Sequence, residues 1–174
     1  MYKNILIAVD GSPTSNLALL EAVKLAPADA SVRVITVVEN PAWSIPLEVG
    51  VMYDVEFMHT SLVKAAKEIL ERAKTLLQHK GINAKTHLID LTEAGSNNIP
   101  SAIMKEAEEW PADVVVIGTH GRRGFNRVLM GSVAEHVIRA ATKPVLLVRA
   151  PGTADDDDDE KTAAGSREDH DTSI

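Results

Sequence analysis

The stretch Val114-Val-Val-Ile-Gly118-Thr-His-Gly121, followed after nine residues by Gly131-Ser132, decides the fold of this chain. Its apolar start is typical of a strand buried on both faces. The glycines leave bare backbone in the loop, and the segment after Gly131 has the pattern of a helix that ends near Thr142. Glycine allows close approach to a ligand, and the first turn of a helix carries unpaired N–H donors with partial positive charge. The stretch therefore predicts a strand, a phosphate-binding loop and a helix N-terminus.

The start of that helix carries a local signal of its own. Ser132-Val-Ala-Glu135 fits a capping box, in which a serine oxygen accepts from the third helical N–H and a glutamate three residues later reaches back. This pattern predicts Ser132 as the N-cap residue.

Apolar runs alternate with helical patterns along residues 1–150. The predicted strands are 5–9, 32–38, 82–89, 114–118 and 145–148. The predicted helices are 13–26 (with Ser12 as its cap), 62–77 (stopped by Gly81), 100–109 and 132–141. This alternation predicts an α/β fold, a single-domain, doubly wound five-stranded parallel sheet with helices on both faces.

Composition agrees with one globular domain that lacks thiol chemistry. The chain has 174 residues, 45% hydrophobic content and no cysteine, so disulfides and thiolate metal sites are excluded. The six histidines have no paired ligand spacing, so we expect no protein-bound zinc. Asp10 interrupts the apolar N-terminus and no run reaches the length of a membrane span, so we expect a cytoplasmic protein without membrane contact.

The net charge of −7 is concentrated at the C-terminus. Residues 151–174 carry nine acidic and two basic side chains, which leaves 16 of each kind in residues 1–150. The neutral body has no basic face for nucleic acid. The tail lacks apolar periodicity and contains five consecutive aspartates, so we expect a nucleotide-binding domain at 1–150 and a disordered acidic tail at 151–174.

The glycine spacing excludes two common nucleotide motifs. A Rossmann fingerprint needs three glycines within six positions, and a P-loop ends in Gly-Lys-Ser/Thr. The spacing Gly118-x2-Gly121-x9-Gly131-Ser132 instead resembles the ATP-binding branch of the universal stress protein family. The segments Asn4-Ile-Leu-Ile-Ala-Val-Asp10-Gly-Ser12 and Lys143-Pro-Val-Leu-Leu-Val148 extend the resemblance over about residues 1–150.

The resemblance implies the strand order 3-2-1-4-5 and a site at the switch point between the first and fourth strands. It implies that Asp10 lies near the ribose or the waters of a magnesium ion bound through the ATP phosphates, and that Val37 contacts adenine. Ribose and phosphates would then meet the backbone of a glycine-rich set of residues. Its members are Gly118, His120, Gly121, Gly131, Ser132 and Val133.

Each side chain also has an ordinary structural interpretation. From spacing alone Asp10 is better explained as a turn or helix-capping acid after the first strand, and the resemblance reverses this preference. Val37 is equally a core residue or a ligand contact. His120 has no partner carboxylate or nucleophile at a recognisable offset, so backbone contact or a plain loop histidine is favoured over a general base. The basic residues of the loop either offset phosphate charge or form a solvated surface; they are Arg122, Arg123 and Arg127.

Two functional classes follow from the resemblance. The favoured one is an ATP-loaded homodimer that regulates a stress response through an unidentified client protein, with slow or no hydrolysis. The rivals are a magnesium-dependent ATPase or phosphotransferase using Asp10 and His120, and a scaffold with an empty pocket. Adenylation chemistry lacks its motifs, both the Ser-Gly-Gly-x-Asp-Ser loop and His-x-Gly-His.

Two further features belong to the edges of the predicted domain. The last strand would be a sheet edge, and the resemblance implies that it pairs with its twin about a two-fold axis. The long connection 39–56 is either a lid over adenine, an ordinary surface loop or a partner contact. The polar segment 93–98 leaves a further edge of the pocket open.

Overall fold

A computed structural model describes residues 1–44, 54–93, 98–120 and 130–150 of the chain. Their strands are β1 (Asn4–Ala8), β2 (Ser31–Val38), β3 (Ala84–Asp90), β4 (Val114–Gly118) and β5 (Val145–Val148). Their helices are α1 (Pro13–Leu25), the short 3-10 helix η1 (Pro41–Ser44), α2 (Val55–His79), α3 (Ile99–Glu109) and α4 (Ser132–Ala140). Five strands and four long helices therefore alternate along the described chain, as the apolar pattern predicts.

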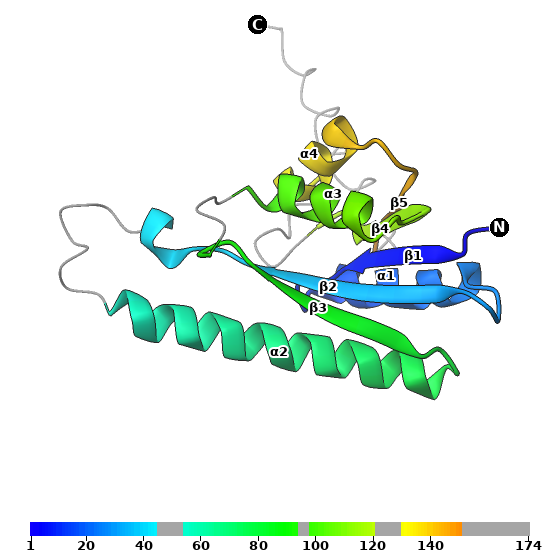
Figure 1. Cartoon of the computed structure of the whole chain (residues 1–174), viewed down its shortest axis with the longest axis horizontal. Helices are drawn as coiled ribbons and strands as arrows, with labels where there is room; N and C mark the ends of the chain where they lie inside the picture. Colours follow the sequence, from blue (N-terminus) through cyan, green and yellow to red (C-terminus); the bar gives the residue numbers. More distant parts are fainter. Residues whose placement is uncertain (45–53, 94–97, 121–129, 151–174) are drawn as a thin grey trace, which may run out of the picture.

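The five strands form one parallel sheet in the order β3-β2-β1-β4-β5. The predicted fold class and strand order are confirmed. Because the chain leaves β1 first toward β2 and later returns to β4 on its other side, the strand order reverses at β1. Both edges of the sheet, β3 and β5, belong to the described part of the chain (Figure 1).

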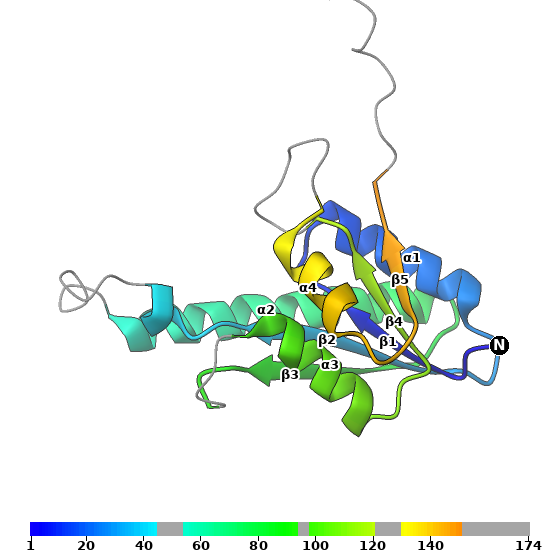
Figure 2. The same ribbon diagram turned by 90° about the horizontal axis from the view of Figure 1, so that it is seen from above.

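Helices cover both faces of the sheet (Figures 1 and 2). Side chains of a strand alternate between its two faces, so Ile5 and Ile7 pack toward α1 and α2, while Leu6 and Ala8 pack toward α3 and α4. All four side chains are less than 10% exposed. The central strand is thus buried on both faces, which explains its continuous apolar run.

The ends of the helices account for several boundaries. The Ser12 hydroxyl accepts from the Ser15 N–H at 3.2 Å, so α1 begins as predicted. Gly81 follows α2 with φ +80°, and the Ile82 N–H donates to the Leu77 carbonyl at 2.9 Å. This is a Schellman motif, which uses Ile82 in the helix terminus. The third strand therefore begins at Ala84, two residues later than predicted.

The predicted capping box at the start of α4 is wrong. Gly131 is the N-cap, and Ser132 is already the first helical residue. Glu135 lies near the start of the helix, but its carboxylate contacts Arg139 at 2.9 Å instead of reaching back. An i,i+4 ion pair on the exposed face thus takes the glutamate that the capping box required.

Candidate functional site at the carboxyl ends of β1, β2 and β4

The strand-order reversal opens a cavity of about 400 Å³. Three strand ends form its floor, and the first turns of α3 and α4 form its walls. Its lining residues are Ala8, Val9, Asp10, Ile35, Val37, Glu39, Ile99, Ile103, Ile117, Gly118, Thr119, His120, Gly131, Ser132, Val133 and Ala134. The structure thus brings together seven residues predicted for the site, namely Asp10, Val37, Gly118, His120, Gly131, Ser132 and Val133.

The remaining predicted site residues cannot be placed. Gly121, Arg122 and Arg127 lie outside the described residues, and so does Arg123. The same holds for the middle of the 39–56 connection, residues 45–53, and for residues 94–97. The roles predicted for these segments stay predictions.

Gly118 is required by packing against α1. A Cβ on Gly118 would lie 2.9 Å from the Thr14 carbonyl carbon, closer than real Cβ atoms approach, and a tight 3.1 Å from the Ser15 nitrogen. The glycine therefore lets the end of β4 touch the first turn of α1. This reason differs from the predicted one, which was close approach of a phosphate.

His120 is anchored through its backbone carbonyl. The carbonyl oxygen accepts hydrogen bonds from the hydroxyls of Thr14 and, at 3.3 Å, of Ser12. The ring Nδ1 lies 3.0 Å from the Thr119 hydroxyl, while Nε2 is buried and has no hydrogen-bond partner among the described residues. The first turn of α1 thus holds the beginning of the glycine-rich loop at the cavity.

The N-terminus of α4 supplies hydrogen-bond donors to the cavity. The Glu135 N–H makes the first intrahelical bond, to the Gly131 carbonyl at 3.0 Å. The N–H groups of Ser132, Val133 and Ala134 precede it and have no acceptor within the helix. Aligned N–H groups and the helix dipole favour an anion at this wall. Ala134 was not predicted as a site residue, although it follows directly from the helix start.

The backbone N–H of Gly131, predicted to meet the ribose or phosphates, bonds within the protein instead. Its N–H donates to the Thr119 carbonyl at 2.8 Å and is therefore occupied within the protein. Its φ and ψ of −62° and 146° are open to any residue. The backbone conformation at this position therefore does not require glycine. Gly131 remains a candidate site residue because it lines the cavity.

Asp10 is both a turn residue after β1 and a cavity-lining residue, the two interpretations that the sequence left open. One carboxylate oxygen accepts from the Ser12 N–H at 3.0 Å, which makes Asp10 a turn residue, while Ser12 is the helix cap. The same side chain is half-buried and lines the cavity. Gly11, between them, has φ +81°, a conformation that favours glycine and completes the turn.

The part of the cavity formed by β2 and α3 is lined by apolar side chains and one acidic residue. Val37 of β2 lines it together with Ile99 and Ile103 of α3. Val37 also packs against the core cluster on this face, so its structural and its ligand-facing interpretations coexist. Glu39, directly after β2, closes this side.

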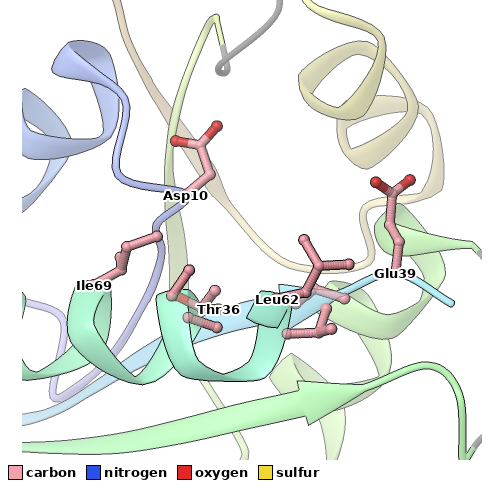
Figure 3. A pocket seen from close by; sticks show the side chains of 9 residues that line it. Asp10, Thr36, Glu39, Leu62 and Ile69 are labelled. Carbon is pink, nitrogen blue, oxygen red and sulfur yellow. The ribbon is translucent and has the colours of Figure 1, made fainter. Parts of the chain in front are cut away.

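A second cavity of about 40 Å³ adjoins the first on the α2 side (Figure 3). Asp10, Val37 and Glu39 line both spaces. The smaller one is completed by residues of β2 and α2, namely Thr36, Val38, Leu62, Ala65, Ala66 and Ile69. In Figure 3 the carboxylates of Asp10 and Glu39 stand apart from each other on the same side of the strand ends. Sequence reasoning missed Glu39, although an acid directly after a strand is the same signal that Asp10 gives.

The rim beside β3 carries an ion pair. His59 Nε2 of α2 lies 2.7 Å from the carboxylate of Asp90, which ends β3. Burial disfavours the charged form of Asp90, but hydrogen bonds from the Thr92 N–H and from His59 outweigh it and lower the pKa of the carboxyl. The pair ties the first half of α2 to the third strand. Among the described residues no group of three or more histidines or acids could hold a metal ion.

Comparisons with known proteins identify the family and agree with the fold. Residues 1–149 match the universal stress protein family. A universal stress protein of Methanocaldococcus jannaschii is 35% identical over 153 residues, covering 87% of this chain and 84% of the relative. No helix in the described ranges is long and apolar enough to cross a membrane.

Solved structures share the fold, and two of them illustrate the similarity. A universal stress family protein from Burkholderia pseudomallei superimposes with a TM-score of 0.66 at 28% identity, covering 86% of this chain and 97% of that one. The universal stress protein of Archaeoglobus fulgidus in complex with dAMP has a TM-score of 0.60 at 28% identity, covering 84% and 98%.

Proposed function

The chain belongs to the universal stress protein family, and from that premise we propose that it is an ATP-binding regulator of a stress response. It acts in the cytoplasm as a nucleotide-loaded homodimer, hydrolyses ATP slowly or not at all, and signals to a client protein. The dAMP complex of the Archaeoglobus fulgidus relative supports an adenine nucleotide as the ligand class.

The observation that carries the proposal is the polarity of the cavity. The cavity lining includes Ser132, Val133 and Ala134, whose N–H groups have no acceptor within α4, and also the apolar side chains of Val37 and Ile103. A nucleotide has the matching polarity, with phosphates at one end and an aromatic base at the other. A volume of about 400 Å³ lies within the range of small-molecule sites, roughly 300–1,000 Å³.

Magnesium would bind together with ATP, through the phosphate groups. Mg²⁺ keeps several waters and is bound by a carboxylate or two together with substrate phosphates in many nucleotide sites. The Asp10 carboxylate is the acid nearest the central strand end and would accept hydrogen bonds from those waters. The ion would neutralise phosphate charge beside this carboxylate.

Slow hydrolysis follows from how the two candidate bases are held. A general base must reach the attacking water with a free acceptor. One carboxylate oxygen of Asp10 accepts from the Ser12 N–H, and His120 Nδ1 lies against the Thr119 hydroxyl. His120 Nε2 has no partner among the described residues, but it is buried, so solvent does not reach it in this conformation. Both side chains therefore serve the loop, which favours a binding protein over the rival ATPase or phosphotransferase.

Dimer formation is supported by the last strand. The carbonyls of Pro144 and Val148 accept from Val115 and Thr119 on the β4 side. Backbone groups alternate in direction along a strand, so the N–H and C=O of Leu147 face away from β4. An edge with outward donors and acceptors is suited to pairing with a second copy.

The test is to purify the protein, denature it and identify any released small molecule by mass spectrometry. We expect an adenine nucleotide, and a turnover assay on reloaded protein should release phosphate far more slowly than the 1–100 s⁻¹ typical of kinases. Turnover in that range would favour the enzyme, and protein that neither retains nor rebinds ATP would favour the empty scaffold.

A further inference from the structure

The end of β2 presents an acid that the proposed function has not used. Glu39 lines the main cavity just after β2, and β2 lies two strands away from β4 in the sheet. Two strands, β1 and β4, follow β2 across the sheet, and neighbouring strands lie about 4.8 Å apart. Glu39 therefore lies on the order of 10 Å across the sheet from the strand that leads to the anion-binding wall.

Apolar, acidic and hydrogen-bond-donating groups therefore follow one another across the carboxyl ends of neighbouring strands. Val37 and Glu39 belong to the end of β2, Asp10 to the end of β1, and Gly118 to the end of β4 before the N–H groups of α4. The sequence across the sheet edge is thus apolar wall with an acid, then an acid, then N–H donors. A nucleotide laid along it has its base, sugar and phosphates in the same order.

Electrostatics fixes which end of the nucleotide faces Glu39. Phosphate oxygens are repelled by a carboxylate and attracted by a helix N-terminus. Ile99 and Ile103 line the same cavity as Glu39, and their apolar side chains suit a flat ring. Glu39 therefore meets the base, while Asp10 meets the sugar.

An ionised carboxylate accepts hydrogen bonds and donates none. Against a purine it is complementary to an exocyclic amino group and repels a carbonyl oxygen at the same position. Resting on the proposed function, we infer that Glu39 is a specificity-determining residue that accepts a hydrogen bond from the 6-amino group of adenine and rejects 6-oxopurines. The side view in Figure 3 places its carboxylate apart from that of Asp10, as two separate contacts require.

The experiment compares Mg-ATP with Mg-ITP, in which a carbonyl replaces the 6-amino group, by calorimetric titration of nucleotide-free protein. The wild type should prefer ATP by at least about tenfold, equivalent to ~1.4 kcal/mol. Glu39→Gln removes the charge and adds a donor, so ATP affinity should fall, ITP affinity should rise and the preference should drop below about threefold. Glu39→Asp retains the charge and should keep a preference for ATP.

Two matched variants separate the base from the rest of the ligand. Glu71→Gln, an exposed acid of α2 that lines neither cavity, should leave both affinities unchanged. Asp10→Asn should weaken ATP and ITP by the same factor, because it contacts the sugar side. Titration with dATP, which lacks the ribose 2′-hydroxyl, tests contacts to the sugar separately from contacts to the base.

The outcomes separate this inference from the proposed function. Failure of the wild type to bind ATP would overturn both. ATP binding with an unchanged ATP-to-ITP ratio in Glu39→Gln would overturn the Glu39 assignment alone. A changed ATP-to-dATP ratio with an unchanged ATP-to-ITP ratio would also overturn it, because Glu39 would then read the sugar.

Discussion

The hydroxyl of Thr14 donates a hydrogen bond to the backbone carbonyl of His120, which follows 106 residues later in the chain. Thr14 lies in the first turn of α1 and is 7% exposed, and His120 begins the glycine-rich loop after β4. Through this contact the helix that follows the first strand holds the loop that follows the fourth. The two halves of the candidate site are thereby fixed to each other.

Replacing Thr14 by valine should loosen this connection. The variant keeps the side-chain shape but leaves the His120 carbonyl with only the longer bond from Ser12, so we expect a loss of about 1–3 kcal/mol in unfolding free energy. ATP affinity should fall by roughly three- to tenfold, or about 0.7–1.4 kcal/mol. Thr75→Val is the control, since its exposed hydroxyl bonds only the Glu71 carbonyl within α2. Equal behaviour of the two variants in melting and titration would contradict this role.

Replacing Gly118 by alanine should damage both the fold and the site. Its Cβ would overlap the Thr14 backbone, and overpacking of this kind costs about 1–3 kcal/mol. Gly81→Ala is an informative comparison, because nothing lies within 4 Å of its added Cβ and only its left-handed backbone costs about 1–2 kcal/mol. Denaturant melts should therefore show both variants destabilised. Calorimetry should show weaker ATP binding for Gly118→Ala alone, and normal binding by that variant would contradict the packing argument.

The buried acid Glu106 should make the fold sensitive to acid. Burial opposes its ionisation, but hydrogen bonds from Arg33 at 2.6 Å and from His87 outweigh this and lower the pKa of the carboxyl. Its contribution is therefore present above the pKa of the unfolded chain, about 4.3, and is lost as pH falls through the lower folded value.

Glu106→Gln tests that contribution. At pH 7 we expect a loss of about 1.5–3 kcal/mol, as for hydrogen bonds to charged groups, and a smaller difference from wild type at pH 3. Glu109→Gln removes a partner of an exposed ion pair 3.7 Å long and should change stability by less than about 1 kcal/mol. Urea melts across this pH range provide the measurement. A wild-type advantage that grows toward pH 3 would have the wrong sign.

The edge strand β5 predicts the effect of a proline on assembly. Leu147→Pro removes an N–H that faces away from β4, so the fold should survive while pairing with a second copy weakens. Leu146→Pro is the contrasting variant, because its N–H faces β4 and its loss should destabilise the sheet. Sedimentation should show a wild-type dimer at micromolar concentration and a folded Leu147→Pro monomer. A monomeric wild type would rule out the dimer.

The sequence predicted the elements well because buried parallel strands leave continuous apolar runs. Strands β4 and β5 begin and end at the predicted residues, and the strand order came from the family resemblance, since periodicity carries no information on order. The errors lie where several backbone or side-chain partners compete. Ile82 completes the terminus of α2 instead of starting β3, and Glu135 pairs with Arg139 instead of capping α4.

Seven of the predicted site residues line one cavity, but the contacts of two of them differ from the reasons given for their prediction. Gly118 and Gly131 were both assigned to phosphate approach, yet Gly118 accommodates α1 and the Gly131 N–H is used by Thr119. Such contacts join segments far apart in the chain, and no local pattern reports them. Glu39 directly follows a predicted strand, as Asp10 does, but the family resemblance did not include it, and its place at the cavity depends on β2 lying beside β1.

The most direct test of the central claim is a titration of ¹⁵N-labelled, nucleotide-free protein with Mg-ATP, followed by amide NMR. An adenine nucleotide in the proposed orientation should produce saturable shifts that are largest at the first-turn amides Ser132, Val133 and Ala134. Amides beyond the amino ends of the strands, such as that of Gly81 before β3, lie far from the cavity and should stay unchanged. Shifts that do not saturate, or that cluster away from the α4 N-terminus, would contradict the proposed site.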